Sequence, residues 1–472
     1  MADLIVSGGT VITMDGGRRV IPDGAVAVTG ATIAAVGPRA EVEAAHAASR
    51  RIDARGKAIL PGLIDGHAHA GHGLVKTMGS GDSAAWSEAC RVIYTLASPP
   101  SFWRAEAALA GLELLKFGVT TSVMLLGGGD SIGRVDDPAH GDAHVDGINA
   151  IGIRRVMVLG PTRPPFPRPY RGADGSVRDV SFEQQAETIG TLVERHHNKG
   201  RITCATLMPV YREETHDAAK VRKIEAQGRV IRDIGSKAGA WFHQDGHRGG
   251  SIEMADRMFG LLGPDAWLSH CTDLTEADIA TLVRTGTSVV HNPSAIAAVR
   301  GFCPVIEMLD RGVTVMIGSD GTAPDRSTDM FRHMFQAMRY HQRAARDEAL
   351  LPPGKALEMV TIDAAKGLGM ADRIGSLEVG KQADIITVEL MAPHMLPANM
   401  PVHRVVYFAS GGDVRDVVVG GEILMRDRVA PHVDEAAIAE AANAETARML
   451  AQSGMAGMIV EDPGWGLTRR RG

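Results

Sequence analysis

Short apolar runs alternate with longer amphipathic stretches through the middle of the chain. The stretches repeat at helical spacing and include Phe102–Lys116, Phe182–His196, Ala218–Ile234, Met254–Leu262, Thr275–Arg284 and Phe302–Arg311. Eight runs have the length and composition of buried strands. They are Ile59–His69, Val119–Leu125, Arg154–Leu159, Ile202–Val210, Ala240–Gln244, Ala266–Cys271, Thr287–His291 and Val313–Ser319. Eight successive strand–helix units predict an α/β fold, a TIM-like (β/α)8 barrel. An open doubly wound sheet is the alternative, but no Gly-rich phosphate loop follows any of these runs.

The two ends of the chain have a different pattern, with short alternating strands separated by turn residues. Both segments are rich in β-branched residues and poor in helical periodicity. We expect them to pair into one small β-sandwich beside the barrel. The predicted organisation is residues 1–57 for the first part of the sandwich, 58–370 for the barrel, 371–430 for the second part, and 431–472 for a helical tail.

Two segments read as long loops after the second and third predicted strands. Gly127–Gly152 is rich in Gly, Asp and His, and Pro161–Asp179 is rich in Pro and Arg. Long loops at the carboxyl end of a barrel commonly form substrate walls, although oligomer contact or a plain exposed insertion would give the same pattern.

Composition and charge narrow the class of protein. The 472 residues carry a formal net charge of −6, which argues against a nucleic-acid partner. Four scattered cysteines form no CxxC pair, which favours a reducing, cytoplasmic location. No secretory signal and no apolar stretch of about 18 residues is present, so we expect no membrane association.

Ionisable residues stand at the ends of five of the eight predicted strands. His67 and His69 end the first run, and the later ones end at or run into His243, His270, His291 and Asp320. If the barrel forms, these side chains converge on one mouth. Three imidazoles and a carboxylate suit Zn²⁺ or another divalent ion with a position left for water.

These motifs resemble the amidohydrolase superfamily, and the resemblance covers almost the whole chain. It rests on His67-Ala-His69, Trp241-Phe-His-Gln, Leu268-Ser-His-Cys, Val290-His-Asn-Pro-Ser, Val315-Met-Ile-Gly-Ser-Asp-Gly-Thr and Gly375-Ser-Leu-Glu-Val-Gly-Lys. Within it, the chain is most similar to cytosine-deaminase-like, triazine-hydrolysing and phenylurea- or thiocarbamate-hydrolysing enzymes. The resemblance implies that the metal ligands are His67, His69, His243 and Asp320. It also implies that Asp320 is the general base and that His270 contacts the water or substrate oxygen.

The resemblance also bears on the number of metal ions. Relatives with two ions bridge them with a carboxylated lysine on the fourth strand, but Ile202–Val210 has neither Lys nor Glu. We therefore expect one divalent ion, Zn²⁺ first, with Co²⁺, Fe²⁺ or Mn²⁺ as alternatives. The Cys204 thiolate is the one side chain on this strand that could bridge a second ion. The alternative is that Cys204 is an ordinary small residue of the buried core.

One departure from the pattern affects the reaction. Deaminases of this subgroup resemble one another in a His-x-x-Glu motif, whereas here the Glu position, three residues after His243, is Gly246. Asp245 or His247 could take over the proton transfer, since both share a face with His243 if the strand continues. The lost acid favours hydrolysis of an amide, urea, carbamate or thiocarbamate. Deamination or dehalogenation of a nitrogen heterocycle is the alternative, and a non-catalytic scaffold is a third reading.

The remaining predicted contacts to substrate come from scattered residues. Trp86 and Phe166 are candidates for an apolar pocket, with ordinary packing as the alternative, and His291 either binds substrate or hydrogen-bonds the backbone. The expected partners are a small-molecule substrate and further copies of the same chain, as a homodimer or larger homo-oligomer.

Overall fold

Eight parallel strands form the central sheet of the computed structural model, which describes residues 2–127, 133–212, 217–459 and 463–468. Hydrogen bonds from Gly66 N to Ile317 O (3.1 Å) and from Asp320 N to His67 O (2.8 Å) connect the first and last strands. The barrel predicted from the sequence is thereby confirmed. Its strands are, in order, β6 (Leu63–Asp65), β7 (Val119–Leu125), β8 (Arg154–Leu159), β11 (Ile202–Leu207), β12 (Trp241–Gln244), β13 (Ala266–Ser269), β14 (Ser288–His291) and β15 (Val315–Ile317).

The first predicted run is divided between two sheets. Its start, β5 (Lys57–Pro61), pairs with strands from both chain ends, and only β6 belongs to the barrel. The division falls at Gly62, where an added Cβ would lie 2.1 Å from Oγ1 of Thr120. The chain therefore changes sheet at a residue that only glycine fits, and the histidine motif follows directly after β6.

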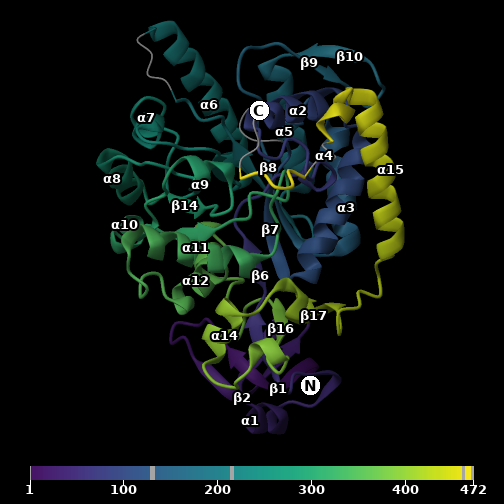
Figure 1. Cartoon of the computed structure of the whole chain (residues 1–472), viewed down its shortest axis with the longest axis vertical. Helices are drawn as coiled ribbons and strands as arrows, with labels where there is room; N and C mark the ends of the chain where they lie inside the picture. Colours follow the sequence, from purple (N-terminus) through teal and green to yellow (C-terminus); the bar gives the residue numbers. More distant parts are fainter. Residues whose placement is uncertain (1, 128–132, 213–216, 460–462, 469–472) are drawn as a thin grey trace.

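Helices surround the barrel (Figure 1), and most of the predicted helical stretches are confirmed with ends shifted by a few residues. The helices are α2 (Ser83–Leu96), α3 (Pro100–Lys116), α4 (Pro138–Ile151), α5 (Phe182–His196), α6 (Ala218–Ala238), α7 (Ser251–Arg257), α8 (Glu276–Thr285), α9 (Ile296–Arg300), α10 (Val305–Asp310), α11 (Met330–Ala345), α12 (Pro353–Met359) and α13 (Ile362–Gly367).

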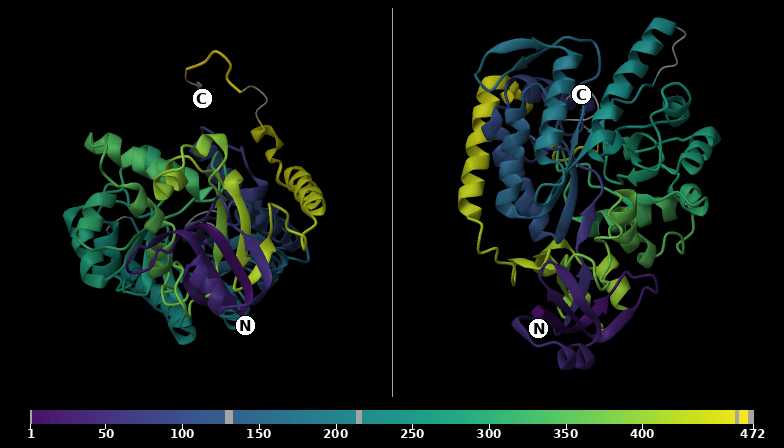
Figure 2. Two further views of the ribbon diagram at one scale, coloured as in Figure 1. Left: turned by 90° about the horizontal axis from the view of Figure 1, so that it is seen from below. Right: turned by 180° about the vertical axis from the view of Figure 1, so that it is seen from behind.

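The two chain ends share a second eight-stranded sheet, which lies at the amino end of the barrel (Figure 1; Figure 2, left). It contains β1 (Ala2–Ile12), β2 (Val20–Thr29), β3 (Thr32–Pro38), β4 (Ala48–Asp53), β5, β16 (Ile385–Glu389), β17 (Val414–Val419) and β18 (Glu422–Met425), with α1 (Arg39–Ala45) and α14 (Pro401–Tyr407) beside it. The pairing of distant segments agrees with the expectation from the sequence. The domain boundaries at residues 57, 370 and 430 stay a prediction.

Both predicted long loops contain regular structure, which corrects the sequence interpretation. Most of Gly127–Gly152 is helix α4, which begins after an Asp137 cap and a proline at its first position. Its many Gly and His residues hide the helical pattern. The second segment folds back as a hairpin of β9 (Arg168–Arg171) and β10 (Val177–Val180).

The C-terminal tail contains α15 (Glu435–Ser453), which runs along α3 at the right of Figure 1. Among the helices that the structure describes, none is long and apolar enough to cross a lipid bilayer.

Candidate metal centre

Four histidines and two aspartates meet at the carboxyl ends of the barrel strands. His67 and His69 follow β6, His243 lies in β12 with Asp245 just beyond it, His270 follows β13, and Asp320 follows β15. All six are buried or nearly so; the most exposed side chains, those of His270 and Asp320, keep 10% of their surface. The sequence predicted five of these as one site, and the structure brings them together.

The two carboxylates face the same imidazoles. Nε2 of His67 lies 3.4 Å from Oδ1 of both Asp245 and Asp320. Nε2 of His69 lies 3.1 Å from Oδ1 of Asp320 and 3.7 Å from Oδ2 of Asp245. Two carboxylates therefore enclose the point at which the two histidine side chains meet.

Backbone carbonyls orient two of the rings. Nδ1 of His243 donates to the carbonyl of Trp267 (2.8 Å), and Nδ1 of His69 donates to that of Gly127 (3.1 Å). A carbonyl only accepts, so each of these rings carries its proton on Nδ1 and directs an unprotonated Nε2 at the cluster. Burial lowers the pKa of His243 well below its usual range, which keeps the ring neutral as metal binding requires.

Unsatisfied nitrogens show that the cluster fits a metal ion. Both ring nitrogens of His67 lack a hydrogen-bond partner among the described residues, and so does Nε2 of His243. Buried polar atoms are costly when unpaired. His67, His69 and Asp245 offer ligand atoms within 4.8 Å of one another, and so do His67, His270 and Asp320. Imidazole nitrogen and carboxylate oxygen are the ligands of Zn²⁺ and similar divalent ions.

Charges within the cluster are strongly coupled. Burial alone would raise the pKa of Asp320, but Arg326 and His270 hold it well below its usual range. Asp245 behaves alike, because His67 and His270 outweigh the effect of burial on its pKa. Burial would lower the pKa of His270, but the charges of Asp320 and Asp245 raise it instead. The cluster therefore stabilises a protonated His270 between two carboxylates.

Two of these residues have a strained backbone. His270 has a φ of 65° and Asp320 a φ of 61°, in the left-handed region that favours glycine. His270 N donates to Val290 O (3.1 Å), and Asp320 N donates to His67 O (2.8 Å). Neighbouring strands thus hold both residues in place, and such strain is commonly found at functional sites.

The sequence lacks the expected glutamate at Gly246, but the preceding residue, Asp245, brings a carboxylate to the site. Asp245 keeps the face of His243, and its Oδ1 lies 3.3 Å from Nε2 of His270 and accepts a hydrogen bond from Oγ of Ser269. Gly246 has a φ of 90° and turns the chain away from the strand direction. The strand therefore does not continue to His247, whose Nδ1 lies 2.9 Å from Oγ of Ser251, although His247 lines one pocket together with Asp245 and His270.

The other predicted contact residues lie farther out. The Trp86 ring packs edge-on against His72 (centroids 5.2 Å apart), and His72 lies 4.8 Å from the ring of His69. Phe166 packs against Phe182 at the rim. These placements leave their roles in binding as predictions.

His291 and Cys204 lie on the helix-facing side of the barrel wall. His291 packs against Tyr340 and His341 of α11, with the His341 ring 5.1 Å away. Burial raises the pKa of the Cys204 thiol to about 12, which keeps it protonated and unsuited to bridging ions. Neither residue belongs to a metal-binding group among the described residues.

Two arginines contribute to the site although the sequence reasoning missed them. Arg326 donates to the carbonyl of Asp320 (3.0 Å), and its Nη2 lies 3.4 Å from Oδ2 of the same residue. Arg212 donates to the carbonyl of Gly246 (3.0 Å). Both come from irregular segments, where no periodic pattern indicates which way a side chain points.

One pocket opens on the cluster, and a larger cavity shares a single residue with that pocket. A pocket of about 160 Å³ is lined by Arg212, Asp245, Gly246, His247, Arg248, His270, Thr272 and Ala297. A cavity of about 710 Å³ shares Arg212 with it and lies between the loops after β8 and β11 and helix α6. Its walls include Phe166, Met208, Val210 and Ile224. The site therefore has a polar inner part and a larger, mostly apolar outer part.

Comparison with known proteins agrees with this architecture. A model of the amidohydrolase family matches residues 175–424. The chain is 31% identical over 449 residues to the 5-methylthioadenosine/S-adenosylhomocysteine deaminase of Syntrophobacter fumaroxidans, covering 92% of this chain and 96% of the relative. It is 29% identical over 462 residues to the 5'-deoxyadenosine deaminase of Methanosarcina mazei, covering 96% and 99%.

Solved structures show the same fold at lower identity. A zinc-bound adenosine deaminase from Xanthomonas campestris superimposes with a TM-score of 0.81 at 24% identity, covering 95% of this chain and 99% of that one. A zinc complex of atrazine chlorohydrolase from Arthrobacter aurescens gives 0.74 at 22% identity, covering 94% and 100%. The chain belongs to the amidohydrolase family, and it is a metal-dependent enzyme that hydrolyses carbon–nitrogen bonds.

Proposed function

We propose that this enzyme is an aminohydrolase that removes the amino group from a purine-type heterocycle, with zinc as its single metal ion. The observation that carries the proposal is the position of Asp245. Gly246 deprives the chain of the acid expected there, yet the Asp245 carboxylate lies 3.3 Å from His270 at the same mouth. Two of the relatives compared above are named as deaminases of adenosine derivatives, which supports the same reaction.

His67, His69, His243 and Asp320 would hold the ion, with all four side chains buried at one point. The chemistry that a bound divalent ion supplies is Lewis acidity, which makes water acidic enough to act as a nucleophile at neutral pH. Asp320 keeps its carboxylate ionised through Arg326 and His270. It therefore has a lone pair with which to accept the proton that the attacking water gives up.

The leaving nitrogen needs a proton as the carbon–nitrogen bond breaks. We assign this proton to the Asp245–His270 pair, in which Oδ1 of Asp245 and Nε2 of His270 are 3.3 Å apart. The protonated imidazole also faces the place where negative charge develops on the attacked ring, and it stabilises that charge. Ser269, hydrogen-bonded to Asp245, fixes the orientation of the carboxylate.

The cavities set the size of the substrate. The pocket of about 160 Å³ next to His270 suits the reacting part of a heterocycle, and the adjoining cavity of about 710 Å³ leaves room for a large substituent. Phe166 and Ile224 line the outer part. A nucleoside or similarly substituted ring fits this division better than a small free base.

Hydrolysis of an amide, urea, carbamate or thiocarbamate is the second candidate. The absence of a glutamate at Gly246 favours it, because these bonds need only one proton relay, which Asp320 supplies. The two candidates share the metal and the base, and they differ in whether the Asp245–His270 pair is required.

A substrate panel on zinc-loaded enzyme tests the proposal. We expect faster ammonia release from adenosine and its 5'-substituted analogues than turnover of anilides, phenylureas and thiocarbamates. The reverse order of kcat/KM would favour the second candidate. Failure of every compound in both groups would contradict both.

We further propose that the enzyme works in the cytoplasm as a homo-oligomer on a small-molecule substrate. The support for the location is that all four cysteines are free and buried, as in proteins of reducing compartments. Light scattering of the purified protein would test the oligomeric state.

A further inference from the structure

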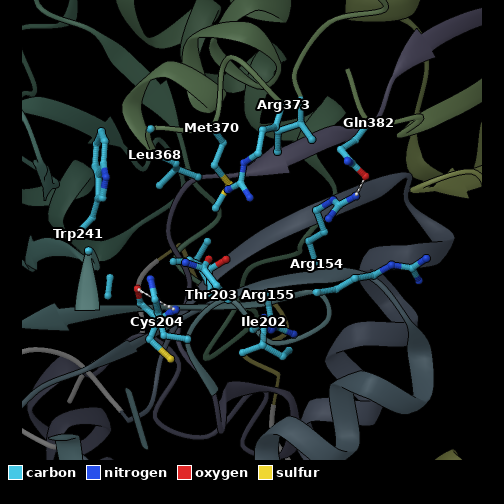
Figure 3. Close-up of a pocket in the computed structure, with 18 of the residues that line it drawn as sticks. Arg154, Arg155, Ile202, Thr203, Cys204, Trp241, Leu368, Met370, Arg373 and Gln382 are labelled. Carbon is cyan, nitrogen blue, oxygen red and sulfur yellow. Dashed lines mark hydrogen bonds between the residues drawn. The ribbon is translucent and has the colours of Figure 1, made fainter. Parts of the chain in front are cut away.

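A third cavity lies at the opposite end of the barrel from the metal centre (Figure 3). Its volume is about 450 Å³, and it is bordered by the first residues of β8, β11, β12 and β13 and by residues 368–374. These are the amino ends of the strands, whereas the histidine cluster stands at their carboxyl ends. Nothing in the catalytic proposal uses this cavity.

Arginines dominate the charged lining. Arg154 is held by Asp384 (Nε to Oδ2, 2.7 Å) and by Gln382 (3.2 Å), a contact drawn as a dashed line in Figure 3. Arg201 donates to the carbonyls of Gly152 (2.6 Å) and Val419 (2.8 Å). Both guanidinium groups are therefore fixed in position by the surrounding backbone and side chains.

Arg373 differs, because its side chain makes no hydrogen bond or ion pair within the described residues. Its backbone is anchored, since its amide donates to Met370 O (2.9 Å) and its carbonyl accepts from Gln382 N (2.8 Å). In Figure 3 the Arg373 side chain lies beside that of Met370, on the side facing Thr203. A fixed backbone thus presents a guanidinium group to the cavity.

Two buried ring nitrogens on the lining also lack partners. Nδ1 of His197 lies 3.0 Å from the amide nitrogen and 3.1 Å from the carbonyl oxygen of Cys204, and its Nε2 is buried without a partner among the described residues. Trp267 is fully buried, and its Nε1–H has no acceptor. The cavity lining therefore includes the Arg373 guanidinium group and two residues with unpartnered ring nitrogens, and its single acidic residue is Asp372.

From this arrangement we propose that the cavity is a second ligand site that binds an organic oxyanion, a carboxylate or a phosphate group. The planar Arg373 fork pairs with two oxygens of such a group. Trp241, Leu368 and Met370 offer apolar surface to the body of the ligand. The remaining volume is larger than a bare ion needs, which favours an oxyanion attached to an organic group.

Binding is tested on the full-length, zinc-loaded enzyme by calorimetry and tryptophan fluorescence. The probes are inorganic phosphate, phenyl phosphate and acetate, so that the phosphate and carboxylate arms identify which oxyanion the site prefers. We expect saturable binding, tighter for phenyl phosphate than for inorganic phosphate. Arg373→Gln should weaken it by about 10- to 100-fold, since a charge-assisted hydrogen bond is lost.

Arg343→Gln, an exposed arginine outside this cavity, is the matched control and should bind like the wild type. Turnover of the best substrate should be unchanged in Arg373→Gln, which separates this site from the catalytic one. No saturable binding of any probe up to about 10 mM would overturn the proposal. Equal binding by wild type and Arg373→Gln would overturn it as well.

Discussion

Replacing Asp245 by asparagine separates the chemistry at this site from its packing. The amide has the size of the carboxylate and still accepts the hydrogen bond from Ser269, so the fold and the cluster of ligands should remain intact. What disappears is the negative charge 3.3 Å from Nε2 of His270. Asp245 helps to raise the pKa of His270, so Asp245→Asn lowers it and weakens the pair as a proton donor.

The expected loss follows from the role of the pair. General acid catalysis by a positioned side chain contributes about 10²- to 10⁴-fold to a rate. That range corresponds to about 2.7–5.4 kcal/mol of transition-state stabilisation. Asp245 is 5% exposed, so bulk water has little access with which to replace the missing proton relay. We expect kcat/KM for ammonia release to fall within this range.

The assay is a pH profile of kcat/KM together with metal analysis of each protein. In Asp245→Asn the alkaline limb should move to lower pH, since His270 loses its proton earlier, while the metal content stays at one ion per chain. Asp265→Asn, a half-exposed aspartate paired with Arg232, is the control and should keep wild-type activity. Activity within about threefold of wild type and an unmoved alkaline limb would refute the assigned role.

Three further outcomes are expected. Gly147→Ala should lower the free energy of unfolding by about 1–3 kcal/mol because the new Cβ would lie 2.3 Å from Arg104 O; Gly190→Ala, with open space around it, should not lower the thermal midpoint. His341 has a pKa lowered to about 4 by burial, so acid destabilises the fold between pH 6.5 and 4 by about 1.4 kcal/mol per pH unit. In His341→Phe, the denaturation midpoint should change less steeply with pH across that range. An unchanged pH dependence would show that His341 is not the cause of the acid destabilisation. Chelation should abolish turnover, and one equivalent of Zn²⁺ should restore it; full activity without a divalent ion would contradict the metal requirement.

Features that depend on local pattern were predictable from the chain alone. Each barrel strand is a short apolar run. In five of them an ionisable residue stands at the end of the run or directly after it, so the same pattern predicted both the strand end and the candidate ligand. His67, His69 and Asp320 are examples, because parallel strands bring their carboxyl ends to one side. Helix α4 was missed, since its glycines and histidines obscure the periodicity and its Asp137 cap is a single-residue signal.

The sequence by itself therefore determined the barrel and the β-sheet that the two chain ends share, because both follow from periodicity. It also placed the candidate metal ligands at strand ends, where they remain a prediction. Only the tertiary structure decided which acid stands beside His270. That choice depends on the chain direction after β12, which changes at Gly246 with its φ of 90°, directly after Asp245. It also decided the third cavity, since Arg373 and Trp267 are more than 100 residues apart and come to line one cavity only when the barrel closes on the segment that follows it. Backbone turns and long-range packing have no periodic trace in a sequence, which is why these features required the folded chain.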